Sequence, residues 1–194
     1  MPNIKEIKKT MKKLGIHVET MSKIVFPKPQ GNQPDEVLAL IDQMEKLLTH
    51  EQCLSVMEEQ GCCKDEKITA PFVEFRLKHK DKTVDEKIKL FDEIKSGHKP
   101  SCNLNHDGTL SIFWDGWNSD KNQCVCHVIK RLYKNRGGQI NVSKTFCGCC
   151  AGHVRNTFQC ALGVKLRLKD IVSSPINSDG KEKCSFLFEI TSSA

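Results

Sequence analysis

The spacing of apolar residues changes near Lys99-Pro100, and this change indicates the fold class. Before this point apolar residues recur every three or four positions, most clearly over 37–48, and after it they alternate, most clearly over 109–115. The first period is typical of helices and the second of strands. We therefore expect an α+β fold: a helical region over 1–98, then a cysteine-rich part over 99–194 in which an antiparallel sheet is packed by helices. The two parts are expected to form one compact unit.

Local start and stop signals give the expected elements. Pro34 followed by two acids is typical of a helix start, Thr83 with Glu86 forms a capping-box pattern, and Gly163 is typical of a helix end. The expected helices are residues 3–14, 34–48, 50–60, 84–95 and 150–162. The expected strands are residues 109–115, 123–133, 164–169 and 184–190, and residues 70–80 fit either type.

Charge and hydropathy exclude several classes of protein. The net charge is +6, with most of the excess in the second half. No apolar run approaches the roughly 18 residues needed to span a membrane. The N-terminal Met1-Pro2-Asn3-Ile4-Lys5 lacks the apolar core of a signal peptide, so we expect a cytoplasmic protein without a membrane partner.

Seven of the eleven cysteines lie between residues 122 and 190. In a reducing compartment such clustering favours metal ligands, reactive thiols or buried small residues over disulfides. Cys124 and Cys126 would face the same side of a strand, and Cys147 and Cys149 form a second pair with the same gap. Because zinc prefers four soft ligands in a tetrahedron, we predict these four as zinc ligands, with Cys150 or His127 able to replace one of them. Reduced thiols in the same places, structural or reactive, are the alternative and the favoured interpretation.

Cys150 and His153 form a candidate catalytic pair. Cys150 lies at the start of the expected helix 150–162, where the helix dipole stabilises a thiolate, and His153 follows one turn later. A cysteine beside a histidine is the minimum for a nucleophile. No Asp or Asn is recognisable as a third member, so a buried, structural Cys150 is the preferred alternative.

Four further residues are candidates for contacting a small ligand. They are Trp114, Trp117, His127 and Arg155. The two tryptophans either wall an apolar pocket or belong to the core. The basic cluster at 130–136 contains a single aromatic, Tyr133, which is a poor platform for stacking bases. An anionic small molecule is therefore preferred to nucleic acid as the partner.

Several features of the last part of the chain resemble a known family. They are the Cys/Gly turn at 147–150, Ala151-Gly152-His153, Leu162-Gly163, the turn at Gly180 and Cys184-Ser185-Phe186. Over about residues 102–190 the chain resembles the 4-vinyl-reductase-type small-ligand domain, which shares its fold with haem-based nitric-oxide sensors and TRAPP subunits. The paired Cys-x-Cys is similar to cysteine-rich bacterial families without assigned function, some named L-2-amino-thiazoline-4-carboxylate hydrolase. The resemblance implies an antiparallel sheet packed by helices with a pocket between them, and no particular chemistry.

Three functional hypotheses follow. The first is a cytosolic small-ligand-binding or sensor domain with a cysteine-rich site that binds zinc or carries free thiols. The second is a cysteine-dependent hydrolase of a small carboxylate substrate. The third, and least favoured, is a zinc-stabilised nucleic-acid adaptor.

Overall fold

The computed structural model describes residues 2–27, 34–61, 66–94, 101–114, 117–118, 123–124, 126–135, 140–178 and 180–193. The first part is helical: α1 (Ile4–Lys13), α2 (Val18–Ser22), α3 (Pro34–Leu47), α4 (His50–Glu58), α5 (Glu66–Lys78), α6 (Val84–Ile88) and the short 3-10 helix η1 (Phe91–Glu93). The second part holds β1 (Ser101–Leu104), β2 (Thr109–Trp114), β3 (Trp117–Asn118), β4 (Gln123–Cys124), α7 (His127–Asn135), η3 (Lys144–Cys147), α8 (Gly148–Leu162), β5 (Val164–Ser173) and β6 (Cys184–Ser193). The predicted α+β class is confirmed. The predicted boundary at Lys99-Pro100 lies outside the described residues.

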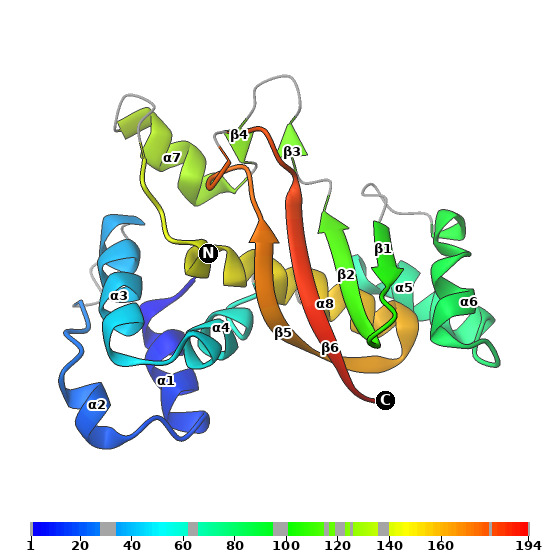
Figure 1. Ribbon diagram of the computed structural model, residues 1–194, viewed down its shortest axis with the longest axis horizontal. Coiled ribbons are helices and arrows are strands. Elements are labelled where there is room, and N and C mark those ends of the chain that lie inside the picture. The colour runs from blue at the N-terminus through cyan, green and yellow to red at the C-terminus, as the bar shows by residue number, and fades with distance from the viewer. Residues whose placement is uncertain are drawn as a thin grey trace.

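An antiparallel sheet in the order β1-β2-β6-β5 forms one layer, and α8 crosses behind it (Figure 1). In its centre Leu110 pairs with Phe188 and Ile112 with Phe186, and all four side chains are buried. β5 alternates buried and exposed residues over 164–169, as a strand with one covered face does. The sheet therefore presents an apolar face to α8.

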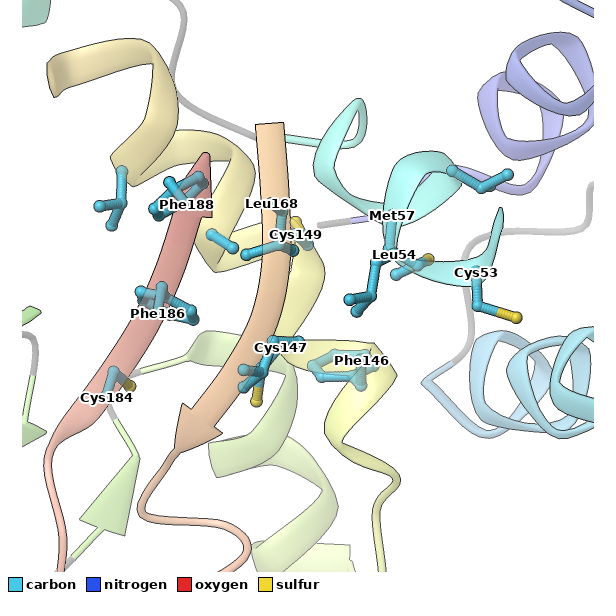
Figure 2. Packing of buried hydrophobic residues seen from close by; sticks show 14 of the residues in the cluster. Cys53, Leu54, Met57, Phe146, Cys147, Cys149, Leu168, Cys184, Phe186 and Phe188 are labelled. Atoms are coloured by element: carbon cyan, nitrogen blue, oxygen red, sulfur yellow. The ribbon is translucent and has the colours of Figure 1, made fainter. Parts of the chain in front are cut away.

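Helices from both parts of the chain share one core. Phe75 of α5, Phe91 of η1 and Phe158 of α8 stack edge to face, with ring centroids 5.5 Å apart at each step. Figure 2 shows α4 residues Leu54 and Met57 packing in the same buried cluster as residues of η3 and β6. Among the described helices, none is long and apolar enough to cross a membrane.

The strand predicted over 123–133 is wrong after residue 124. Residues 127–135 form α7, which buries Val128, Ile129 and Leu132 and exposes Lys130 and Lys134. Those three apolar residues have helical spacing, and burial of this single stripe favours the helix. The helix predicted over 84–95 is also shorter, because α6 ends at Ile88 and η1 follows it.

α4 and α8 pack at unusually close range. A Cβ on Gly152 would lie 1.9 Å from the carbonyl oxygen of Glu58, and one on Gly148 would lie 2.6 Å from Met57 Cβ. Beside this contact, Arg155 Nη1 of α8 lies 3.0 Å from Glu58 Oε1 of α4. Glycines four positions apart thus allow α8 to approach α4, and the ion pair joins the two helices.

Side chains bind backbone groups of β5, the strand at one end of the sheet order. Glu58 Oε2 accepts a hydrogen bond from the N–H of Leu168 at 2.9 Å. Gln159 Oε1 accepts from the N–H of Leu166 at 2.8 Å. Two backbone N–H groups of β5 are therefore bound by side chains of α4 and α8 rather than by another strand.

Candidate thiol site between α7 and α8

Cys126 lies directly before the first residue of α7, the helix that stands next to β3 and β4 at one end of the molecule (Figure 1). Its carbonyl accepts from the N–H of Lys130 at 3.0 Å, as that of a helix N-cap residue does. Its sulfur accepts hydrogen bonds from the backbone N–H groups of Val128 and Ile129, which are the second and third residues of α7. The Cys126 sulfur thus lies at the N-terminal end of α7, where the helix dipole favours a negative charge.

Cys150, in the first turn of α8, is the hydrogen-bond partner of Cys126. The hydrogen bond from the Cys150 thiol, together with the N–H groups of α7, lowers the pKa of Cys126 to about 6, against the effect of burial. The same hydrogen bond, followed by burial, raises the pKa of Cys150 well above its ordinary value. These contacts make Cys126 the more acidic thiol of the pair and Cys150 the one that donates to it.

Three buried cysteines lie around this pair. Burial raises the pKa of Cys124 to about 11 and that of Cys147 to about 12, and it also raises the pKa of Cys184. Charge on Cys126 opposes ionisation of all three. Figure 2 shows Cys147 and Cys184 among apolar side chains at one end of the buried cluster. These three cysteines remain protonated at neutral pH and pack as small apolar residues.

Cys149 takes part in the contact between α8 and α4. It is 5 % exposed, and its thiol donates to the carbonyl oxygen of Gln60 at 3.1 Å. In Figure 2 it lies away from Cys147 and Cys184. The second Cys-x-Cys pair is thus divided, because its two members lie in different surroundings.

The four cysteines predicted as zinc ligands are not assembled around one point. Within the part of the chain that the structure describes, no three His, Cys, Asp or Glu side chains converge closely enough to hold a metal ion. Cys124 and Cys126 do not share one strand either, since β4 ends at Cys124. This arrangement does not fit a tetrahedral zinc ion, and zinc binding by Cys124, Cys126, Cys147 and Cys149 stays a prediction.

The predicted nucleophile Cys150 is placed next to another thiol. The ring of His153 packs edge to face on Trp114, with centroids 5.1 Å apart and an interplanar angle of 81°. Both His153 and Trp114 are partly buried. A catalytic role for Cys150 and His153 stays a prediction, but the contacts favour Cys126 as the thiolate.

Arg155, predicted to contact a ligand, joins two carboxylates. Its guanidinium lies 3.0 Å from Glu58 Oε1 and 2.8 Å from Glu59 Oε1, and its side chain is 13 % exposed. Burial raises the pKa of Glu58, and the charge of Arg155 opposes that rise. The arginine thus stabilises the ionised form of a buried acid.

Ligand contacts by Trp114 and Arg155 stay predictions. The side chains of Trp117 and His127 lie outside the described residues, as do Cys62 and Cys63.

Two hollows lie elsewhere in the molecule. One, of about 350 Å³, is lined by Pro71, Glu74, Phe75, Lys78, Glu93 and Ile94. The other, of about 550 Å³, lies where α5 and α6 meet the end of α8. None of the cysteines that the structure describes lines either of them.

The role of Cys126 as a helix cap was missed because residues 123–133 were expected to form a strand. The helical spacing of Val128, Ile129 and Leu132 was the signal that could have revealed it. Its partner Cys150 belongs to a different helix, α8, and the spacing of residues along the chain cannot predict that these two cysteines lie in contact.

No family model, curated protein or solved structure matches the chain. The resemblance to 4-vinyl-reductase-type domains therefore stays a prediction.

Proposed function

We propose that this chain is a small-ligand-binding or sensor protein that responds to small oxidants through the thiol pair Cys126 and Cys150. The observation that carries the proposal is the hydrogen bond between these two thiols at the adjoining starts of α7 and α8. Two sulfurs within hydrogen-bonding distance, one of them stabilised as a thiolate, form the arrangement used by reversible thiol switches.

The chemistry follows from the different protonation of the two sulfurs. The Cys126 thiolate attacks one oxygen of a hydroperoxide, the O–O bond breaks, and an alkoxide or hydroxide leaves, which gives a sulfenic acid on Cys126. The sulfur of Cys150 then bonds to that of Cys126, and the sulfenic hydroxyl departs as water with the Cys150 proton. The product is a disulfide between α7 and α8, which any thiol reductant can reverse.

The surroundings support a small anionic or neutral oxidant reaching Cys126. Lys130 and Lys134 are exposed on α7, and the charge of Lys130 acts on the neighbouring Cys124. A few exposed cations attract small anions more readily than they hold a nucleic acid, so we keep nucleic acid as the disfavoured partner.

A cytoplasmic location is part of the proposal. The nine cysteines among the described residues are all free thiols. A reducing compartment would keep them so and would allow a disulfide at Cys126 and Cys150 to report a change in redox state.

The test is oxidation of the full chain with one equivalent of hydrogen peroxide, followed by mass spectrometry of its cysteine peptides. The wild type should give a disulfide between Cys126 and Cys150, and Cys150→Ser should instead accumulate a Cys126 sulfenic acid that dimedone traps. Cys160→Ser, which removes a half-buried cysteine farther along α8, should behave as the wild type. Oxidation spread evenly over the cysteines, or unchanged in Cys126→Ser, would refute the proposal.

A further inference from the structure

The second hollow is lined by residues of α5, of α6 and of the junction between α8 and β5. Figure 1 shows α5, α6 and the last turn of α8 together at one end of the molecule. Its volume is about 550 Å³. Its lining residues are Arg76, Leu77, Lys80, Lys82, Thr83, Val84, Lys87, Leu162, Gly163 and Val164. Cys126 and Cys150 are not among these lining residues, so the hollow is a separate place from the thiol pair.

The lining is strongly positive. Among the described residues that line the hollow, four are cations and none is an acid. The nearby acids of α6 have other partners: Asp85 is bound by Lys89, and the carboxylate of Glu86 accepts from the Thr83 N–H at 2.7 Å as part of the capping box. Within the described part of the lining, therefore, no carboxylate neutralises these cations.

Arg76 and Lys87 are the two innermost cations. Lys87 is only 7 % exposed, and its amino group donates to the carbonyl oxygen of Leu162 at 2.9 Å. Burial lowers the pKa of Lys87, and the charge of Arg76 lowers it further. The Nε of Arg76 is buried and has no hydrogen-bond partner among the described residues. Two cations held this close together, one of them buried, form an arrangement that an anion would stabilise.

Apolar groups complete the hollow. Leu77 lines the hollow and leaves 62 % of its surface exposed to solvent. Leu162 and Val164 are buried and form an apolar wall. Gly163 has φ 70°, and a Cβ there would lie 3.1 Å from Arg76 Cδ, so glycine leaves room for the arginine stem. A ligand at this site would meet both cations and hydrocarbon.

We propose that the hollow between α5, α6 and the end of α8 binds a small organic anion, a phosphate monoester or carboxylate joined to an apolar group. The anionic end contacts Arg76, Lys80 and Lys82, and the apolar end covers Leu77 and Val84. Concave sites that combine apolar walls with a few polar groups are typical of small-ligand binding, and guanidinium groups suit planar or tetrahedral oxyanions.

Isothermal titration calorimetry of the full chain tests the proposal, with phenyl phosphate and inorganic phosphate as probes. Phenyl phosphate should bind one site per chain, more tightly than inorganic phosphate because of the apolar wall. The double variant Lys80→Gln/Lys82→Gln changes only exposed side chains and should weaken binding by about tenfold, as loss of roughly 1.4 kcal/mol implies. Arg76→Gln should weaken it at least as much.

Lys165→Gln is the matched control. Lys165 is exposed and follows the lining residue Val164, but it does not line the hollow. Its loss should leave the affinity within about twofold of the wild type, since a nearby exposed charge is largely screened. Absence of saturable binding to the wild type, or equal weakening in Lys165→Gln, would overturn the site. Equal affinity for the two probes would overturn the apolar half of the ligand.

Discussion

Gly152 of α8 lies against the backbone of Glu58 so closely that a methyl group in place of its hydrogen would come within 1.9 Å of the Glu58 carbonyl oxygen. The contact brings Arg155 within reach of the Glu58 carboxylate, and that carboxylate in turn binds the N–H of Leu168. One close helix contact thus links α4, α8 and β5.

Gly152→Ala should lower the free energy of unfolding by about 3 kcal/mol, because the methyl group would meet backbone atoms that cannot rotate away. Asn156→Ala, one turn further along α8 at a half-exposed position, is the control and should not destabilise the protein. Urea denaturation followed by circular dichroism measures both. Equal stability of Gly152→Ala and the wild type would show that α4 and α8 are not held at this distance.

Arg155→Gln should cost about 3 kcal/mol near pH 7, because it leaves the buried Glu58 carboxylate without its cation. The pKa of Glu58 is already raised by burial, and loss of the arginine raises it further. The folded state then binds a proton more readily than the unfolded chain, so stability falls as the pH rises from about 4.5 through the folded pKa. The difference between variant and wild type should therefore shrink as the pH is lowered toward 4.5.

Arg167→Gln provides the comparison. Arg167 lies 2.6 Å from Glu189, but both side chains are substantially exposed, so its loss should cost no more than about 1 kcal/mol. Urea titrations at pH 5 and pH 7 give both differences. A pH-independent loss in Arg155→Gln would contradict the role assigned to Glu58.

Alkylation of Cys126 by iodoacetamide should show an apparent midpoint near pH 6, which follows from the lowered pKa of that thiol. Cys150→Ala removes the donated hydrogen bond and should move the midpoint to higher pH. Peptide mass spectrometry at short reaction times separates Cys126 from the buried cysteines, whose pKa values are raised. Faster labelling of Cys150 than of Cys126 would instead restore Cys150 as the nucleophile.

Chelators should leave the free energy of unfolding unchanged. Zinc at the four predicted cysteines would require Cys149 to give up its hydrogen bond to Gln60 and to turn from α4. Unfolding measured with and without EDTA, together with elemental analysis of protein purified without chelator, decides this. One zinc per chain, with a loss of stability in EDTA, would favour the zinc site over the thiol pair.

Local signals in the sequence were sufficient for much of the fold. The capping box at Thr83 forms with both of its hydrogen bonds, and Gly163 ends α8 in the left-handed conformation. Both depend on residues within one turn of each other. The apolar alternation that predicted β2 and β6 depends on the period of a single strand and was equally reliable.

The thiol site was less predictable because its contacts join distant segments. An apolar run such as Val128-Ile129 fits a strand or a helix, and only burial beneath neighbouring elements favours the helix. Arg155 was predicted to contact a ligand, whereas its partners Glu58 and Glu59 lie at the end of α4, far away in the sequence. Burial and long-range pairing determine these roles, and neither can be read from spacing.

The hydrogen bonds that Glu58 and Gln159 accept from β5 bear on how the protein avoids aggregation. A strand at the end of a sheet, with its donors free, can recruit a strand from another molecule and so start an intermolecular sheet. On β5 the N–H groups of Leu166 and Leu168 are already occupied by side chains. The acid that joins α4 to α8 therefore also makes this side of the sheet a poor template for fibril growth.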